Sequence, residues 1–304
     1  MKVSIVMRAK NSDWVIGEAL AALHAQTLSG FELLVVDSGS TDRTLEIARR
    51  YPCRLRQIPA SDYFPGPVLN AAIRETSGDV IVFQNSDVVP LVPDALERLV
   101  AAVSAPGVDA AFARQVPRPE AHLWVRRDHA VAFPAQGPAP AWMPFSLPFA
   151  AMRRSSWRAH NFYTDAWGSE DTEWGVWAGR HDRVVTYVPE AKVMHSHNYT
   201  LRELIGRRFI EGEADAFIHR GADSVFRMVA RTARSIAADV AAHAAAGDLR
   251  GMLASVPRRA VYHAAYYRGH RHGERRRVSS DRDATLGQRM VLEWYGGAAA
   301  REAR

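Results

Sequence analysis

The chain has 304 residues, of which 47% are hydrophobic and 24% are charged, as in ordinary folded proteins. No apolar run reaches the roughly 18 residues of a membrane-spanning helix, and Cys53, the only cysteine, excludes an internal disulfide and a metal site built from cysteines. Residues 201–304 hold 19 arginines and 12 acids (+7), whereas residues 1–200 carry −1. A basic last third of this kind suits a nucleic acid, an anionic lipid or an acidic acceptor.

The first 115 residues alternate strand and helix signals. Buried strands are expected at 3–7, 31–36, 80–83 and 109–113, with helices between them around 16–23, 45–48, 68–76 and 96–103. Such alternation predicts an α/β fold with a mostly parallel sheet flanked by helices.

Two later segments break this rhythm. Residues 117–148 contain seven prolines without clear periodicity, which predicts a long irregular insertion. From Leu201 the pattern is helical, with punctuation near Gly221, Gly247 and Pro257, and predicts a helical C-terminal extension. The opening residues have only a short apolar stretch before Arg8, too short for the core of a signal peptide. We therefore expect a cytoplasmic protein.

Two of the predicted strands end in a polar turn that contains a carboxylate. Asp37 follows one buried run, and Asp87 follows the next one, after Asn85 and Ser86. Ligands of open α/β sheets bind at the carboxyl ends of the strands. Asp37 is therefore a candidate contact for a base or ribose, and Asp87 for a divalent cation that neutralises a diphosphate. The simpler interpretations are a helix cap and a solvated turn.

Two further motifs lie between residues 168 and 199. Glu170 and Asp171 begin a predicted helix, where they either complement the helix dipole or supply a general base. His195 and His197 are two residues apart on a predicted strand, so that they face the same side and could bind a metal.

These motifs and their order resemble bacterial family 2 glycosyltransferases, particularly rhamnosyltransferase-like members. The resemblance covers about residues 1–205 and rests on six segments: SIVMRAKN, VVDSGSTDRTLEIA, LNAAIRETSGDVIVFQNSDVVP, RRSSW, SEDTEWGVWAGR and VPEAKVMHSHNY. It implies a GT-A fold, in which a nucleotide-binding part (about 1–115) and an acceptor part (about 116–200) form one domain, with the basic helical region (201–304) appended. It also implies Mn²⁺ or Mg²⁺ as the cofactor.

Carried over residue by residue, the resemblance implies a nucleotide site at the start of the chain. Its members are Arg8, Ala9, Asn11, Asp37, Ser38, Asn70, Asn85 and Ser86. Asp87 matches the last acid of the family's D-x-D motif, but Asn85 stands where the first acid is expected. His195 is then the preferred second metal ligand, with His197 as the alternative.

The resemblance also assigns the reaction. Asp171 matches the catalytic base, and Glu170 orients the acceptor or shares that role. The acceptor would meet Trp142, Phe145, Arg153, Trp157 and Trp174, although these aromatic residues suit a core equally well. The implied reaction is an inverting transfer from dTDP-rhamnose or a UDP-sugar to a hydroxyl group of a glycan or lipid-linked acceptor.

Two alternatives compete with this interpretation. One is a catalytically weakened protein that binds a nucleotide-sugar; the other is a basic module that binds nucleic acid or a membrane. No RNA-binding signature accompanies the arginines. The C-terminal region could dock on an anionic membrane surface at the inner face of the cell, or form a helical cap or an oligomer interface.

Overall fold

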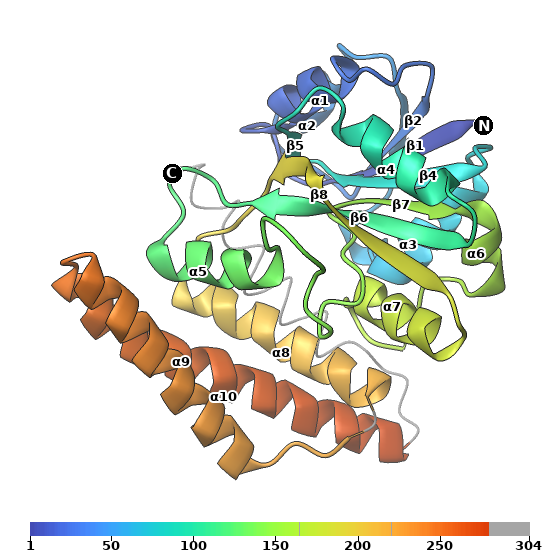
Figure 1. The fold of residues 1–304 in the computed structure, drawn as a ribbon. Coiled ribbons are helices and arrows are strands. Elements are labelled where there is room, and N and C mark those ends of the chain that lie inside the picture. The colour runs from blue at the N-terminus through green and yellow to red at the C-terminus, as the bar shows by residue number, and fades with distance from the viewer. Residues whose placement is uncertain (164, 220, 280–304) are drawn as a thin grey trace. The chain divides into compact units, whose positions relative to one another are not determined.

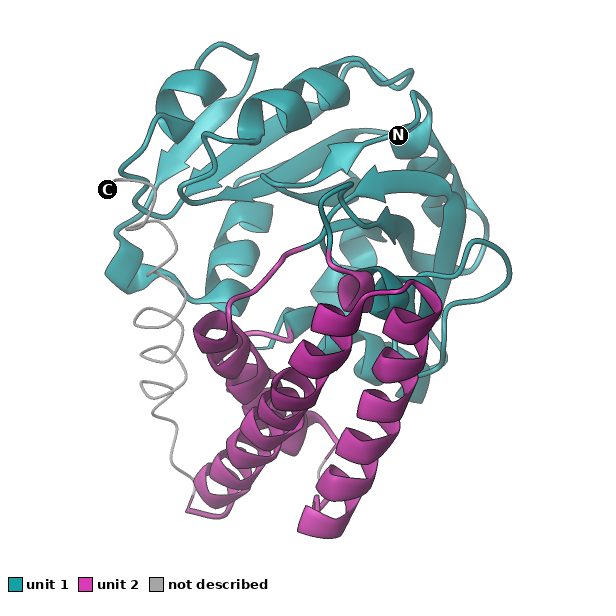
Figure 2. Ribbon diagram, turned by 90° about the vertical axis from the view of Figure 1, so that its left-hand side faces the viewer, with its two compact units in different colours: residues 1–121, 126–163, 170–196 teal, residues 122–125, 164–169, 197–304 magenta. Residues whose placement is uncertain are grey.

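The computed structural model describes residues 1–163, 165–219 and 221–279. The chain divides into two compact units, which Figure 2 shows in different colours. The first unit comprises residues 1–121, 126–163 and 170–196. The second comprises residues 122–125 and 164–169 and the chain from His197 onward. The second unit therefore contains two short earlier segments in addition to the chain from His197 onward.

An eight-stranded sheet forms the first unit, in the order β3-β2-β1-β4-β7-β6-β8-β5 (Figure 1). Its strands are β1 (Val3–Ala9), β2 (Glu32–Asp37), β3 (Arg54–Gln57), β4 (Val80–Asn85), β5 (Val89–Pro90), β6 (Val108–Val116), β7 (Phe149–Arg153) and β8 (Val184–Met194). Strands β1 to β4 pair in parallel, and β6 pairs in parallel with β8. β7 and β5 run antiparallel to their neighbours. The sheet is thus mostly parallel, as the alternating signals predicted.

The strands are buried on both faces. Ile5 and Met7 of β1 belong to one hydrophobic cluster, and Val6 between them belongs to another. Val82 of β4 and its neighbour Ile81 are divided in the same way. Since successive side chains point to opposite faces of a sheet, both faces must be covered, which explains the continuous apolar runs of the sequence.

Seven α-helices and one short 3-10 turn connect these strands in the described part of the chain. They are α1 (Ile16–His24), α2 (Thr44–Ala48), η1 (Ala60–Asp62), α3 (Pro65–Arg74), α4 (Ala95–Ser104), α5 (Leu123–Ala132), α6 (Arg154–Ala159) and α7 (Glu170–Arg180). α5 corrects the expectation of an irregular segment over 117–148, because ten of these residues are helical despite the flanking prolines.

Long helices make up most of the second unit: α8 (Leu201–Ile218), α9 (Val225–Ala245) and α10 (Leu249–Ser279). Thr200 and Glu203 form a capping box at the start of α8. The predicted punctuation near Gly221 and Gly247 separates these helices, but Pro257 lies inside α10. No helix in the described ranges is long and apolar enough to span a bilayer.

Glycines let α8 and α10 approach each other closely. A Cβ atom at Gly212 would lie 2.1 Å from the carbonyl oxygen of Tyr266, and one at Gly269 would lie 1.9 Å from that of Phe209. Buried ion pairs accompany this contact: Arg276 binds Glu213, and Arg259 of α10 binds Asp239 of α9. The three helices therefore pack with polar as well as apolar contacts.

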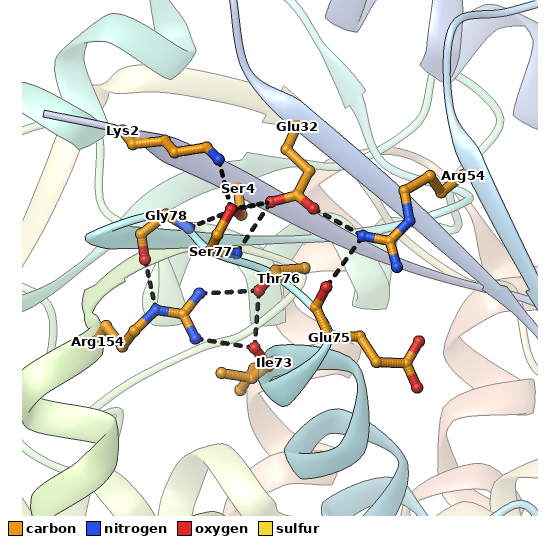
Figure 3. Close-up of polar contacts among 10 residues, drawn as sticks. All are labelled: Lys2, Ser4, Glu32, Arg54, Ile73, Glu75, Thr76, Ser77, Gly78 and Arg154. Atoms are coloured by element: carbon orange, nitrogen blue, oxygen red, sulfur yellow. Dashed lines mark hydrogen bonds and ion pairs between the residues drawn. The ribbon is translucent and has the colours of Figure 1, made fainter.

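Polar side chains tie together the amino ends of the parallel strands (Figure 3). The Glu32 carboxylate accepts hydrogen bonds from Ser4 Oγ (2.7 Å) and Arg54 Nη1 (2.8 Å). Arg154 donates to the carbonyl oxygens of Ile73 (2.8 Å) and Gly78 (2.5 Å). Side chains and backbone carbonyl groups of the protein itself thus hold the amino ends of these strands together. The residues of the site predicted from the sequence follow the carboxyl ends.

Candidate active site

The loops that follow β1 and β2 are joined where these strands end. Ala9 pairs with Asp37 in the sheet, and Ser38 N donates to Ala9 O (3.0 Å). Asn11, in a left-handed backbone conformation (φ 44°), accepts a hydrogen bond from Thr41 N at 2.8 Å. Ala9, Asn11, Asp37 and Ser38 thus form one local structure, as a shared nucleotide pocket requires.

Asp37 is fully buried and is bound by its own loop. Its carboxylate accepts hydrogen bonds from Gly39 N (3.1 Å), Ser40 N (3.0 Å) and Ser40 Oγ. In this arrangement the side chain fixes the turn after β2. The simpler interpretation of a helix cap is wrong, because the N-cap residue of α2 is Arg43, whose side chain makes no capping hydrogen bond. Direct contact of Asp37 with a nucleotide stays a prediction.

β4 ends beside β1. Arg8 pairs with Asn85 in the sheet, and Arg8 Nη2 donates to Asn85 Oδ1 at 3.3 Å. Ser86 N donates to Arg8 O (3.0 Å), and the Ser86 and Ser12 hydroxyl groups are 2.7 Å apart. The amide oxygen of Asn85 is therefore directed toward a guanidinium group. Asp87 is the only carboxylate among residues 85–87.

The same arginine reaches the start of α7. Arg8 Nη1 is 2.6 Å from Glu170 Oε1, and both side chains are largely buried. Burial lowers the pKa of Arg8, but Tyr63 and Glu170 raise it by more, so that the net shift is upward and the group stays charged. This ion pair connects residues that are 162 positions apart in the sequence.

Asp171 follows directly and is oriented by backbone amides. Its Oδ2 accepts a hydrogen bond from Leu147 N (3.2 Å) and its Oδ1 from Thr172 N (2.8 Å). Leu147 precedes β7, whose first residue Phe149 pairs with Gln84 near the end of β4. The carboxylate of Asp171 therefore lies at the sheet edge where β4 ends.

A short antiparallel pairing brings together Asp87 and His195. Val89 of β5 pairs with Met194, the last residue of β8, so the residues just outside this pair are also neighbours. His195 Nε2 lies 3.6 Å from Asp87 Oδ2. This is too long for a hydrogen bond but close to the separation of about 3 Å expected between two ligands of one cation.

Gln115 orients His195. Its Oε1 is 2.7 Å from His195 Nδ1, and its Nε2 donates to Ser146 Oγ at 2.9 Å. Because the amide nitrogen donates to Ser146, the amide oxygen accepts a hydrogen bond from Nδ1, and Nε2 is the ring nitrogen on the side of Asp87. A metal-binding histidine characteristically donates its other N–H in this way. Sequence reasoning missed Gln115, because no local motif marks it.

His197 lies two residues further along the chain and belongs to the second unit. Both histidines follow the end of β8, so the expectation that they lie on a strand is wrong. The Asp87 and His195 pair lies entirely within the first unit and carries the argument for a cation.

Several predicted contacts prove to be core residues. Phe145, Trp157 and Trp174 are buried, and a ring without exposed surface has no face to offer to an acceptor sugar. Trp157 Nε1 instead donates to Asn70 Oδ1 (2.9 Å), and Asn70 Nδ2 donates to Phe162 O (2.9 Å). The hydrogen bonds of Asn70 thus connect α3 with the segment after α6, and the structure gives it a packing role.

The two remaining acceptor candidates differ. Arg153 pairs with Val80 at the start of β4 and donates to the carbonyl oxygens of Val108 and Ala105, so it lies at the wrong edge of the sheet for the predicted role. Trp142 is 60% exposed, and its neighbours Ala141 and Met143 line a cavity of about 510 Å³. Among the acceptor candidates, Trp142 alone has a largely exposed side chain.

The protein-family model that matches this chain is that of glycosyl transferase family 2, over residues 4–169. This range includes β1 to β7 and ends just before Glu170. The chain is a family 2 glycosyltransferase. The family resemblance of the sequence motifs is thereby confirmed.

Among curated relatives, this glycosyltransferase is similar to two rhamnosyltransferases. It is 29% identical over 227 residues to the O-antigen chain rhamnosyltransferase RfbN of Salmonella typhimurium, covering 70% of this chain and 72% of the relative. It is 28% identical over 205 residues to the O-antigen chain rhamnosyltransferase WbaN of Salmonella anatum, covering 63% and 64%. The glycosyltransferase is therefore rhamnosyltransferase-like.

Solved structures show the same fold. The mannosyltransferase PcManGT of Pyrobaculum calidifontis, solved with GDP-Man and Mn²⁺, has a TM-score of 0.63 and 21% identity, covering 90% of this chain and 86% of the other. Staphylococcus aureus TarS 1-349 in complex with UDP-GlcNAc has a TM-score of 0.55 and 16% identity, covering 92% of each chain. The glycosyltransferase thus has the GT-A fold that the resemblance implied.

Proposed function

We propose that this glycosyltransferase transfers a sugar with inversion from a nucleoside-diphosphate donor, dTDP-rhamnose or a UDP-sugar, to a hydroxyl group of a glycan or lipid-linked acceptor. In this proposal Asp171 is the general base, and Asp87 with His195 holds Mn²⁺ or Mg²⁺. The similarity to two O-antigen chain rhamnosyltransferases favours dTDP-rhamnose and a growing glycan.

The observation that carries the proposal is the position of Arg8. Its guanidinium contacts Asn85 at the end of β4 and Glu170 at the start of α7, and its strand continues into Ala9, which pairs with Asp37. Asp37, Asp87 and Asp171 therefore come to one edge of one sheet from three distant parts of the sequence. That edge is where open α/β sheets bind nucleotides.

The residues at this edge fit a divalent cation. An aspartate oxygen and an imidazole nitrogen, 3.6 Å apart, suit Mn²⁺, and the amide of Gln115 orients the imidazole. When bound, a divalent cation would neutralise charge on the departing diphosphate. Because Asn85 is directed toward Arg8, we infer that His195 replaces the missing first acid of the motif.

Asp171 is better suited than Glu170 to act as the base. Glu170 would have to give up its 2.6 Å ion pair with Arg8 to accept a proton. Asp171 instead accepts hydrogen bonds from two backbone amides, which orient its carboxylate. Glu170 and Arg8 then position α7, and Asp171 contacts the acceptor.

The proposed reaction is a single displacement. The acceptor hydroxyl group loses its proton to Asp171 as its oxygen bonds to the anomeric carbon, and the bond from that carbon to the diphosphate oxygen breaks with both electrons going to the diphosphate. The oxygen enters opposite the leaving group, so the configuration inverts. Orientation of the acceptor by the protein lowers the entropic part of the barrier.

Release of nucleoside diphosphate tests the proposal. The full chain is incubated with Mn²⁺ and in turn with dTDP-rhamnose, UDP-glucose, UDP-N-acetylglucosamine and GDP-mannose, with water or a sugar as acceptor. We expect release from one donor, a loss of about 10²- to 10⁴-fold in Asp171→Asn, and a similar loss in Asp87→Ala. Asp182→Asn, in the exposed turn after α7, is the matched control, because asparagine tolerates its positive φ of 54°.

Each arm addresses one part of the proposal. Unchanged release in Asp171→Asn rejects the base. Unchanged dependence on Mn²⁺ concentration in Asp87→Ala rejects the cation site. If no donor is turned over but one of them raises the melting temperature, the chain is a catalytically weakened protein that binds a nucleotide-sugar. The presence of Asn85 in place of the first acid of the D-x-D motif suggests this alternative.

A further inference from the structure

α9 exposes a stripe of apolar side chains to solvent, although Met228, Ile236 and Val240 of the same helix are partly buried. Asp239 and His243 are buried on the packed side, whereas Phe226 is 83% exposed and Val229 is 56% exposed. The exposed side chains recur every three or four residues, so they form a single stripe along the helix. The stripe consists of Phe226, Val229, Ala230, Ala233, Ala237, Ala241 and Ala244.

The first turns of α10 carry a second exposed apolar stripe. Leu249, Leu253 and Val256 are four and three residues apart, so they lie on one side of this helix, and Leu253 is 69% exposed. An amphipathic helix of a globular protein normally packs its apolar side against the core. Because α9 and α10 both expose an apolar stripe, we expect a binding partner to cover these side chains.

The charge around the stripes is predominantly positive. Residues 225–279 contain eleven arginines and three acids, which gives +8. Asp239 is buried against Arg259, Asp248 binds His243, and Glu274 binds Arg271. The exposed arginines of the two helices include Arg227, Arg234, Arg250, Arg268 and Arg275.

We propose that α9 and α10 dock on an anionic lipid bilayer, with the two apolar stripes inserted among the acyl chains and the exposed arginines against the headgroups. An amphipathic helix with arginines beside its apolar face binds the bilayer surface in this way, without spanning it. The surface so defined, by the two stripes and these five arginines, is called the docking surface below.

Charge complementarity selects the bilayer over the other occupants. A nucleic acid would be attracted by the arginines but would leave the apolar stripes exposed to water. A second copy of the chain, meeting the same surface across a two-fold axis, would place arginines against arginines. An anionic bilayer satisfies both the apolar and the basic groups of the docking surface.

The expected strength follows from the residues involved. Each basic side chain near an anionic bilayer contributes about fivefold to binding, so Arg227→Gln with Arg234→Gln should weaken it about 25-fold. Phe226→Asp removes an apolar ring and adds a negative charge, which the anionic lipid repels. This substitution should weaken binding by at least about tenfold. Neither change touches the packed side of α9, so folding should be preserved.

Vesicle sedimentation tests the inference. The full chain is mixed with vesicles of phosphatidylcholine and phosphatidylglycerol, and separately with vesicles of phosphatidylcholine alone. We expect binding to the anionic vesicles, weaker binding to the neutral ones, and the losses given above for the α9 variants. The matched controls in the first unit are Arg49→Gln with Arg180→Gln and Leu91→Asp, which change exposed residues of the same kinds and should bind like the unaltered chain.

Other outcomes overturn the inference. Equal binding to both vesicle types, or no binding, would reject an anionic bilayer. Light scattering that shows a dimer, dissociated by Phe226→Asp, would assign the stripes to a second copy of the chain. Equal losses in the α9 variants and their first-unit controls would mean that general charge, and not the docking surface, attracts the protein. Since none of these measurements uses a sugar donor, they are independent of the proposed transferase activity.

Discussion

Replacing Arg8 by methionine should destabilise the first unit by about 3 kcal/mol. Arg8 and Glu170 are 16% and 8% exposed, and their ion pair is 2.6 Å long. Removing one member of a buried pair costs roughly 3–5 kcal/mol, because the other charge is left without compensation. The lower end applies here, since both side chains retain some contact with water. The longer contacts of Arg8 with Asn85 (3.3 Å) and Tyr63 (3.5 Å) add little.

Thermal and urea denaturation, followed by tryptophan fluorescence, measure this cost. For a unit of this size, about 3 kcal/mol lowers the melting temperature by roughly 6–12 °C. Arg50→Met is the control, because Arg50 and Glu46 form an exposed ion pair, which contributes at most about 1 kcal/mol. The double variant Arg8→Met with Glu170→Met should lose less stability than the two single variants lose together, since it leaves neither charge of this pair unpaired and buried.

Two results would refute this reasoning. If Arg8→Met costs no more than Arg50→Met, the buried pair does not hold α7 to β1. If the losses of the two single variants simply add in the double variant, Arg8 and Glu170 act separately, and the argument that Arg8 joins the two motifs fails.

Three further predictions test the cation site and the helical unit. Gln115→Leu should weaken Mn²⁺ binding about 10- to 100-fold in calorimetric titration, because His195 loses the partner that orients it; unchanged affinity would rule out this positioning role. Gly269→Ala should destabilise the α8–α10 contact by about 1–3 kcal/mol or more in urea denaturation, because the added methyl group overpacks it. The control is Gly179→Ala in α7, where a Cβ meets nothing within 4 Å; it should be neutral or slightly stabilising. Burial, followed by nearby arginines, lowers the pKa of His263 to about 4 from 6.5, so unfolding takes up a proton between these values, and stability should fall as the pH drops from 6.5 toward 4. The melting temperature of His263→Gln should fall less over this range; equal slopes would show that His263 does not contribute.

The strand ends could be predicted because their signal is local. Val80–Asn85 is a continuous apolar run that ends in polar residues. A parallel strand that is buried on both faces typically has such a continuous apolar sequence. The same holds for the strand before Asp37. Placing these ends at one edge required only that parallel strands share their direction.

The partners of the site residues could not be predicted, because they are distant in the sequence. Arg8 and Glu170 are separated by 162 positions, and His195 and Gln115 by 80. Their pairing depends on how strands and helices pack, which no local pattern encodes. The sequence is equally silent on which aromatic rings fill the core, and Trp174 proves to be fully buried.

In the helical region, composition indicated helices but did not reveal their packing. Pro257 was expected to interrupt the helical pattern, yet it lies inside α10, although proline removes one backbone hydrogen bond of a helix. Arg276 contributes to the positive charge of the last third of the sequence, but its side chain is buried against Glu213. Burial of single side chains on a helix is decided by its neighbours.

The antiparallel direction of β7 affects how the enzyme can vary. β6 ends at Val116 and β7 begins at Phe149, and because the two strands run in opposite directions, both of these ends lie at the same edge of the sheet. The 32 residues between them leave and re-enter the sheet at the strand ends where the proposed site lies. Insertions, deletions or exchange of this segment would therefore change the surroundings of the proposed site while the register of every strand is kept. In the proposed function, one scaffold could in this way be adapted to different acceptors.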